Sequence, residues 1–385
     1  MIRRLVLVLA LLLLAAFIAA WFLLPPYFEK KMAGVIGPPV EISANARRLH
    51  STLRVTDLHA DALIWKRDLL ARNARGQVDV PRLQEGNVAV QLFTVPTVFS
   101  AKRANRSRGT GLNTLTLASV LRPDWPKAWF RLDARAFQQA ARLRAFAERS
   151  NDSLVLLRTR ADLARHLEAR RGGSRSVGAL LGIEGAHAME GDLDNVDAFY
   201  DAGYRVIGLL HHFDNEIGGS STGIGKGGLT PFGRELVARL DRRGFILDLA
   251  HASPAVIAEV TKMTSRPVIV SHTGVRGTCD RDRNLPDASL RQVAATGGVI
   301  GIGFWPGAVC GVDADAIARA IAHAASVAGV DHVALGSDFD GDSLPFDAAH
   351  IAQITDALLR AGMSEPAIRK VMGENTLRVL AQSLP

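Results

Sequence analysis

The residues that could do chemistry begin in the stretch Val55-Thr56-Asp57-Leu58-His59-Ala60-Asp61. An apolar, β-branched lead-in that ends in Asp-x-His-x-Asp is typical of a buried strand that carries an imidazole and a carboxylate to its carboxyl end. Residues two apart in a strand point to the same side, so His59 and Asp61 can bind one cation without distortion of the backbone. Polar residues that merely cap the strand are the alternative, and this stretch alone does not exclude it.

Other short apolar runs end in the same kinds of residue: Glu184, His211, His251 and His272 each follow such a run, and Asp338 lies in Ser337-Asp338-Phe339-Asp340-Gly341. Imidazoles and carboxylates without thiolates suit zinc, and manganese, cobalt and iron are also compatible. Five candidate ligands are too many for one tetrahedral ion with an open position: His59, Asp61, Glu184, His251 and His272. They predict two ions about 3.5–4 Å apart, bridged by a carboxylate such as Glu184, that hold a water of lowered pKa.

The elements that must position these residues alternate between short apolar runs and helix-like segments. This rhythm predicts parallel strands in a closed (β/α)8 barrel of the TIM type, in which all strands open their carboxyl ends onto one face. The eight predicted strands are Arg54–Leu58, Val88–Val95, Val177–Ile183, Tyr204–Leu210, Phe245–Leu249, Val268–Val270, Val299–Phe304 and His332–Gly336.

Apolar residues at helical spacing predict helices over Phe137–Ser150, Asn195–Ala202 and Asp315–Ala328. The interval from Thr97 to Val177 is too long for one crossover, so it must hold extra helices and the short apolar run Leu154–Leu157. The tail, residues 348–384, is predicted to form two helices, with Ser364 as the N-cap of the second.

Four of the 11 histidines are the strand-end residues already named. His212 is ambiguous, since it would point away from His211 in a continuing strand. The other six are predicted to have surface or structural roles: surface for His50, His166, His323 and His350, structural for His187 and His332.

The N-terminus carries Arg3 and Arg4 before an unbroken apolar run, Leu5–Leu24. A helix of that length spans about 30 Å, the thickness of a bilayer core. The run is longer than a usual signal-peptide core and its cleavage pattern is poor, so an uncleaved anchor is favoured. The two arginines predict a single pass through the inner membrane, with the rest of the chain on the periplasmic side. We divide the chain into an anchor (1–31), a tether (32–49) and a barrel (50–385).

The composition, 48% hydrophobic and 22% charged, fits a packed domain of enzyme size. The net charge of +8 comes mostly from arginines, dense between Lys102 and Arg175, which we interpret as solvated helix faces; nucleic acid is not an expected partner outside the membrane. Two cysteines exclude zinc sites built on thiolates. One disulfide between Cys279 and Cys310 and two free thiols are both compatible with the sequence.

The order of these motifs resembles the membrane (renal) dipeptidase family, within the amidohydrolase-like barrels. The resemblance extends from about residue 50 to the segment Gly373–Arg378. It rests on six motifs in order: Asp57–Asp61, Gly182–Gly185, Asp248–His251, Ser271-His272, Arg283–Asp287 and Ser337–Gly341.

The resemblance implies a zinc-dependent dipeptidase that cleaves the peptide bond of dipeptides with a metal-bridging hydroxide, and homodimers are common in that family. By it, His59 and Asp61 bind one zinc, His251 and His272 bind the other, and Glu184 bridges the two. By it also, Asp338 transfers protons, His211 binds the carbonyl side of the scissile bond, and Arg283 holds the substrate's terminal carboxylate.

Alternatives remain at this point. Arg283 lies among Asp280, Arg281 and Asp282, so it could belong to a surface ion-pair cluster. The glycine-rich run 218–228 departs from the family members with which we compare it; we expect a lid beside the cleft rather than a phosphate cradle. Another hydrolase, acting on a lactone, phosphoester or N-acyl amino acid, and a catalytically silent binding protein are the competing functions.

Overall fold

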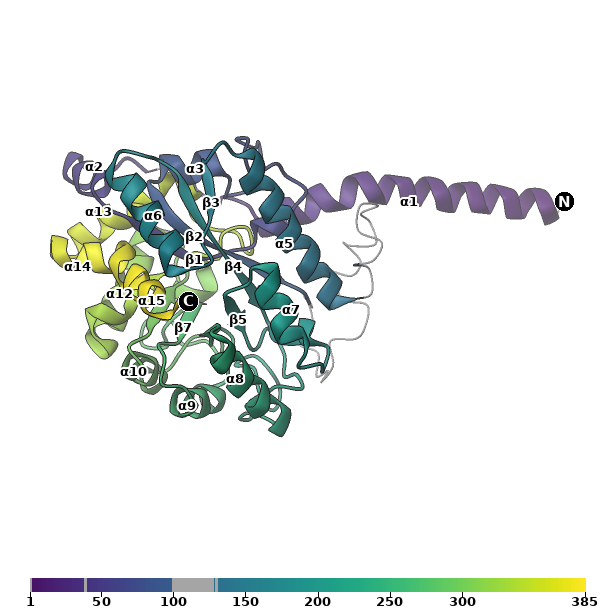
Figure 1. The fold of residues 1–385 in the computed structure, drawn as a ribbon. Helices are drawn as coiled ribbons and strands as arrows, with labels where there is room; N and C mark the ends of the chain where they lie inside the picture. The colour runs from purple at the N-terminus through teal and green to yellow at the C-terminus, as the bar shows by residue number, and fades with distance from the viewer. Residues whose placement is uncertain (1, 38–39, 99–127, 129–130) are drawn as a thin grey trace.

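The structure is a computed structural model that describes residues 2–37, 40–98, 128 and 131–385. Within these residues, eight parallel strands close into a barrel surrounded by helices (Figure 1). The barrel strands are β1 (Val55–Ala60), β2 (Val88–Pro96), β4 (Val177–Glu184), β5 (Val206–Gly208), β6 (Ile246–Asp248), β7 (Ile269–Thr273), β8 (Val299–Ile302) and β9 (Val333–Leu335).

The predicted (β/α)8 barrel is confirmed, since every predicted strand overlaps an observed one. Pairing of β2 with β4, over Val90–Pro96 and Gly178–Glu184, closes the barrel. The apolar run in the long interval forms the short strand β3 (Leu154–Leu156), which pairs with the first residues of β4. The extra helices predicted between Thr97 and Val177 include α5 (Leu132–Arg149) and α6 (Arg160–Arg171), while residues 99–127 and 129–130 of that interval lie outside the described residues.

The barrel interior is filled by a cluster of buried apolar side chains to which every barrel strand contributes. It includes Val299, Ile269 and Ile246, the first residues of their strands, and the last helix α15 (Asn375–Ser383) packs against it through Leu377 and Leu380. Each such side chain contributes about 1.5–3 kcal/mol by leaving water. The C-terminal helix thus packs at the amino ends of the strands, and the polar strand-end residues lie at the other end.

Several helices begin where a capping side chain precedes a proline. Thr230 accepts a hydrogen bond from the Gly233 N–H, and Ser253 does so from the Val256 N–H. Such caps satisfy backbone donors that have no partner inside the helix. The helices of the body are α2 (Ala44–Ser51), α3 (Val80–Glu85), α5 (Leu132–Arg149), α6 (Arg160–Arg171), α7 (Asn195–Ala202), α8 (Pro231–Arg243), α9 (Pro254–Met263), α10 (Asp287–Ala295), α11 (Pro306–Val309), α12 (Ala314–Ala328), α13 (Ala352–Arg360) and α14 (Glu365–Arg369).

The predicted helices are confirmed, and the bounds of α7 match exactly the predicted range. In the tail, α14 continues through a π-helical turn (Lys370–Glu374) into α15. Ser364 is the residue before α14, but its side chain makes no capping hydrogen bond there. The predicted N-cap position is therefore confirmed, without a hydrogen bond from the helix backbone to its side chain.

Two histidines that we predicted to be on the surface are buried. His50 is 6% exposed, with Nδ1 2.8 Å from Thr355 Oγ1 and Nε2 3.0 Å from the Gly86 carbonyl oxygen. His166 is 3% exposed and lies 2.7 Å from the Ala89 carbonyl oxygen. Burial lowers the pKa of both rings. The error came from treating a polar residue in a helix as solvated, although backbone carbonyls can satisfy an imidazole in the core.

The N-terminal helix α1 (Ile2–Met32) projects away from the barrel over most of its length (Figure 1). It is long and apolar enough to cross a membrane, and its most apolar window has a mean hydropathy of 3.0. A signal sequence can have the same length and hydropathy. Its last turn contacts the body: Glu29 is 5% exposed and pairs with Arg67 at 2.8 Å and with Arg75 at 3.2 Å. The division at residues 31 and 49 stays a prediction.

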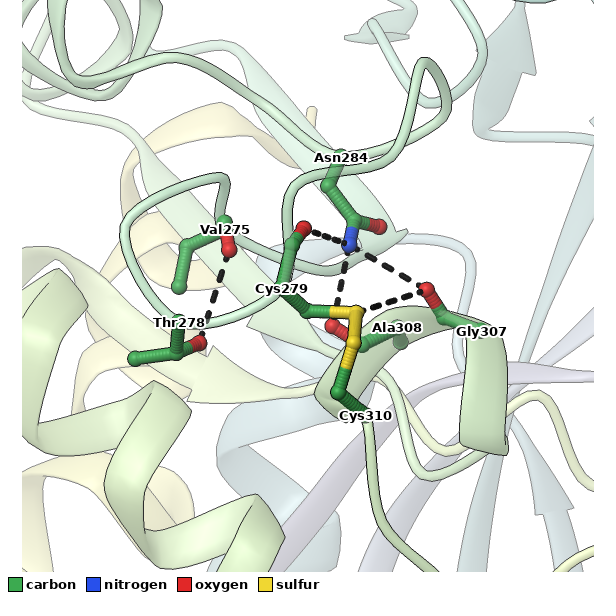
Figure 2. The surroundings of a disulfide bond; sticks show 7 residues. All are labelled: Val275, Thr278, Cys279, Asn284, Gly307, Ala308 and Cys310. Carbon is green, nitrogen blue, oxygen red and sulfur yellow. Dashed lines mark hydrogen bonds between the residues drawn. A yellow bond between two sulfur atoms is a disulfide. The ribbon is translucent and has the colours of Figure 1, made fainter.

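Cys279 and Cys310 form a disulfide (Figure 2). It joins the loop after β7 to the end of α11, across 31 positions of sequence. Beside it, the Asn284 amide donates hydrogen bonds to the carbonyl oxygens of Cys279 at 2.7 Å and Ala308 at 3.1 Å (Figure 2). The disulfide and Asn284 therefore fasten the residues on both sides of Arg283 to the following βα unit.

We expect the double variant Cys279→Ser/Cys310→Ser to lower the free energy of unfolding by about 2–4 kcal/mol, because opening this loop returns conformational entropy to the unfolded chain. Urea unfolding of the purified full chain measures the difference. Dithiothreitol should destabilise the unmutated chain by a similar amount and leave the variant unchanged; equal sensitivity of both proteins to the reductant would contradict the assignment.

Candidate functional site

The predicted site residues converge at the carboxyl ends of the barrel strands. His59 is the penultimate residue of β1 and Asp61 follows the end of that strand; Glu184 is the last residue of β4, and His272 lies in β7. The remaining ones lie in the loops just beyond their strands: His211 after β5, His251 after β6 and Asp338 after β9. All seven line or adjoin one cleft of about 470 Å³, within the usual range for small-molecule sites.

The Glu184 carboxylate is the centre of this cluster. Its Oε1 lies 3.0 Å from His251 Nε2, 3.4 Å from His272 Nε2 and 3.6 Å from His59 Nε2. Its Oε2 lies 3.4 Å from His211 Nε2. Burial raises the pKa of Glu184 well above its usual value, although His59 acts in the opposite direction. Burial of an ionised carboxylate costs free energy unless a positive charge lies close to it.

The donor set fits metal ions. His59 Nε2 is buried without a hydrogen-bond partner, and Asp61 Oδ1 and Asp338 Oδ1 lie 3.5 and 3.8 Å from it. His251 Nε2 and His272 Nε2 are 3.1 Å apart, and two neutral rings can share only one proton there. When nitrogen and oxygen lone pairs point toward one another and too few protons lie between them, a bound cation can accept all of them. Three sets bring ligand atoms within 4.8 Å of one another, and the first two share His59: His59, Glu184 and His272; His59, Asp61 and Asp338; and His211, His212 and His251.

The pKa shifts agree with this interpretation. Burial lowers the pKa of His251 and of His272 well below the usual value, so both rings are neutral and able to bind a cation. Burial acts in the same direction on His59, but Glu184 and Asp61 outweigh it and raise its pKa to about 10. The proton on His59 occupies the lone pair that a metal ion would use, so a bound cation would displace it.

Hydrogen bonds from the surrounding residues orient the imidazoles. The Ser271 hydroxyl lies 3.2 Å from His59 Nδ1 and 3.0 Å from His272 Nδ1, so one side chain turns both Nε2 atoms inward. His211 Nδ1 lies 2.8 Å from the Val98 carbonyl oxygen, which requires the proton on Nδ1 and leaves Nε2 as an acceptor. Such partners fix ring orientation and tautomer around metal sites.

Asp57 supports the cluster by joining two strands and not through a hydrogen bond to an imidazole. Its carboxylate accepts hydrogen bonds of 2.7 Å from Gln91 Nε2, from the Ser337 N–H and from the Ser337 hydroxyl. The same hydroxyl lies 2.8 Å from the His59 carbonyl oxygen. Asp57 therefore holds the ends of β1 and β9 together, and with them His59 and Asp338.

Asp338 has a left-handed backbone conformation and a carboxyl group with a raised pKa. Its φ is 66° and that of His251 is 63°, left-handed conformations that cost a residue with a side chain about 1–2 kcal/mol. Backbone strain of this kind gathers at functional sites. Burial raises the pKa of Asp338 to about 7, helped by Asp61 and opposed by His59. A carboxyl near neutrality can both take and give a proton.

Arg283 lies in the cleft and not in the exposed ion-pair cluster that was its alternative. Its Nη2 donates a 2.9 Å hydrogen bond to the His272 carbonyl oxygen, and its guanidinium stands 5.7 Å from the Trp305 ring centroid. Burial lowers its pKa to about 10, against the opposing effect of Asp338, so it stays charged at neutral pH. The neighbouring Asp282 instead pairs with Lys226 at the surface, 2.8 Å away.

Some cleft residues were not predicted from the sequence. His212 also lines the cleft, its ring 4.1 Å from that of His211, because β5 ends at Gly208 and strand alternation no longer applies. Trp305 follows β8 by a few residues, and an aromatic residue at a strand end was a signal that we did not use. Phe28, Lys31 and Met32 come from the end of α1, which we had assigned wholly to the anchor and tether.

The glycine-rich run borders the cleft through Thr222, as expected. Its backbone N–H groups at Ser220 and Gly225 donate to the Asp214 carboxylate at 2.8 and 2.6 Å, which occupies the donors that a phosphate would need. The Ser220 hydroxyl donates to the His211 carbonyl oxygen at 2.5 Å. The loop is thus tied to the backbone of His211 and supports the cluster from outside.

Known proteins that this chain resembles include dipeptidases. The family model for "Membrane dipeptidase (Peptidase family M19)" matches residues 43–384. Dipeptidase aclJ of Aspergillus oryzae is 29% identical over 348 residues, 85% of this chain and 77% of that protein. An uncharacterized dipeptidase of Schizosaccharomyces pombe is 32% identical over 217 residues, 53% of this chain and 52% of the other.

Solved structures share the fold. A metallo peptidase of family M19, dipeptidase AC, superposes with a TM-score of 0.72 at 24% identity and covers 86% of this chain and 99% of its own. A Rhodobacter sphaeroides metallo peptidase, liganded with a phosphinate mimic of the dipeptide L-Ala-D-Ala, gives 0.71 at 24% identity, with 86% and 99% covered. The resemblance read from the six motifs is therefore confirmed: the chain belongs to the membrane dipeptidase family, peptidase family M19.

Proposed function

We propose that this protein is a zinc-dependent metallo-dipeptidase of the membrane dipeptidase type. The observation that carries the proposal is the presence, in one cleft, of a metal-binding cluster centred on Glu184 and a charged guanidinium, Arg283. The first suits hydrolysis, and the second suits a substrate with a free carboxylate. A cleft of about 470 Å³ accommodates a dipeptide and limits longer peptides.

In this proposal His59 and Asp61 would hold one zinc ion, His251 and His272 would hold a second, and Glu184 would serve as a ligand at both sites. Two zinc ions bound there would lower the pKa of a water molecule and polarise the scissile carbonyl. Asp338 takes the proton that this water loses and delivers it to the leaving amine, which a carboxyl with a pKa near 7 does in both directions.

Arg283 binds the terminal carboxylate of the dipeptide. The hydrogen bond from Arg283 to the His272 carbonyl oxygen fixes the arginine side chain beside the metal-binding cluster. Binding of the carboxylate therefore also positions the peptide bond next to that cluster. A planar guanidinium can hold both carboxylate oxygens at once. The disulfide and Asn284 stiffen the loop that carries it.

His211 is assigned to the carbonyl side of the scissile bond. In its neutral form its Nε2 is an acceptor, because the Nδ1 proton is held by the Val98 carbonyl oxygen. Donation to a carbonyl oxygen therefore requires a second proton on the ring. Burial opposes that proton, and negative charge developing on the substrate oxygen favours it, so the interaction strengthens as the reaction proceeds.

Two further features complete the proposal. Arg3 and Arg4 would keep the start of α1 in the cytoplasm and place the barrel outside the inner membrane, where a disulfide such as Cys279–Cys310 persists. The solved Rhodobacter sphaeroides relative holds a mimic of L-Ala-D-Ala, so L,D-dipeptides belong among the substrates to be assayed.

Removal of metal provides the first test. The full chain, purified in detergent, should contain about two zinc ions per polypeptide, because the cluster offers ligands for two. Elemental analysis by mass spectrometry measures this zinc content. Dialysis against a chelator should abolish hydrolysis of L,L- and L,D-dipeptides, and added zinc should restore it. A preparation that stays active without metal refutes the proposal.

Asp338→Asn tests the proton transfer. We expect kcat to fall about 10²–10⁴-fold, because the amide cannot exchange a proton, while the zinc content stays unchanged. Kinetics and metal analysis of the same sample separate the two effects. Loss of zinc together with activity would instead make Asp338 a metal ligand.

Arg283→Ala tests recognition of the carboxylate. KM for a dipeptide should rise about 10–100-fold, because the variant loses the hydrogen bonds between the guanidinium and the charged carboxylate. KM for the same dipeptide amidated at its C-terminus should change less. The exposed neighbour Arg281→Ala is the matched control and should leave both substrates unaffected. An equal loss on both substrates would favour a hydrolase of another substrate class.

A further inference from the structure

The end of the N-terminal helix reaches the catalytic cleft. Phe28, Lys31 and Met32 line the same cavity as Glu184 and Asp338. In a helix, residues three and four apart share a face, so these three side chains form one strip turned toward the cleft. Lys30 and Lys31 are both exposed, but only Lys31 is among the residues that line the cavity.

A buried ion network fixes the orientation of this strip. Glu29, 5% exposed, pairs with Arg67, and Arg67 also pairs with Asp340, which is fully buried. Asp340 further accepts a 2.7 Å hydrogen bond from the Gln77 N–H. Buried charges are costly when separated from their partners, so Glu29 holds the last turn of α1 in one rotation about its axis.

The backbone after the helix is held by the loop that follows β9. The Ser343 hydroxyl donates to the Lys31 carbonyl oxygen at 2.9 Å. The Leu344 N–H donates to the Gly34 carbonyl oxygen at 3.0 Å, and the Ile36 N–H donates to the Leu344 carbonyl oxygen at 2.8 Å. This loop also carries Asp338, so the segment at the end of α1 and the proposed proton carrier are held by one stretch of chain.

We propose that Phe28, Lys31 and Met32 are a permanent wall of the substrate cleft, and that Lys31 makes the enzyme prefer dipeptides with an acidic side chain over those with a basic one. The inference rests on the proposed dipeptidase function and adds substrate selection to it. Phe28 and Met32 provide apolar contact. Lys31 and Arg283 are the two Lys or Arg side chains of a lining that also holds the carboxylates of Asp61, Glu184, Asp338 and Asp342, so the Lys31 ammonium is a charge that a substrate side chain meets there.

A consequence concerns the mature protein. The wall requires the chain at least from Phe28 onward, so processing must spare this segment even if the apolar part of α1 were removed. It also places the mouth of the cleft within a few residues of the apolar run that ends at Leu24.

The test uses the full chain in detergent and a matched pair of charge reversals. For each protein, kcat/KM is measured at low ionic strength for dipeptides that carry Glu or Lys, in turn, at each of their two positions. Lys31→Glu should reduce the ratio of kcat/KM values, Glu substrate over Lys substrate, at least about fivefold for one position, because a charge across a partly solvated cleft acts over this range. Lys30→Glu, the same charge change outside the cleft, should alter the ratio less than about twofold.

Equal shifts in the two variants, or no shift in either, overturn the inference. An unmutated chain that hydrolyses no dipeptide instead refutes the proposed function. The intact mass of the protein from membranes gives a readout that does not depend on activity: a first residue at or before Phe28 is expected, and a mature chain that begins after Met32 overturns the inference directly.

Discussion

The rest of the site depends on the burial of the Glu184 carboxylate among imidazoles from four other strand ends. Its oxygens lie 3.0–3.6 Å from four ring nitrogens, in a region that excludes most water. Neutral rings and a buried carboxyl cannot satisfy one another with the few protons available, whereas cations satisfy all of them together. This single demand explains why Ser271 and the Val98 carbonyl oxygen fix the rings with their Nε2 atoms turned inward.

A barrel meets that demand because its strands open onto one face. This rule is also why much of the site could be predicted from sequence: an imidazole or carboxylate that follows a short apolar run is at the carboxyl end of a strand, and such ends converge. Glu184, His251 and His272 were found in this way, and Arg283 was found by the resemblance of its motif. The structure places all four of them in one cleft.

What could not be predicted depends on contacts between segments distant in sequence. The left-handed backbone of His251 and Asp338 could not be predicted from residue type, because Asp and His adopt it more often than most residues but still only rarely. His50 was misjudged because its partners, Thr355 and Gly86, lie far away in the chain. The disulfide was left open because two cysteines 31 positions apart have no defined distance until β7 and α11 are placed. The end of α1 was assigned to an anchor because its composition carries no sign of a cleft.

The segment after β9 joins these separate features. Ser337 contacts Asp57 and the His59 carbonyl oxygen and thereby sets the end of β1. Asp338 faces the metal-binding cluster from the next position. Asp340 turns to the opposite side, where it pairs with Arg67 and so with Glu29 of α1. Four consecutive residues, Ser337–Asp340, thus connect the barrel, the proposed proton carrier and the N-terminal helix. The helix that can cross a membrane is therefore mechanically part of the site, and a free tether would not explain the buried charge of Glu29.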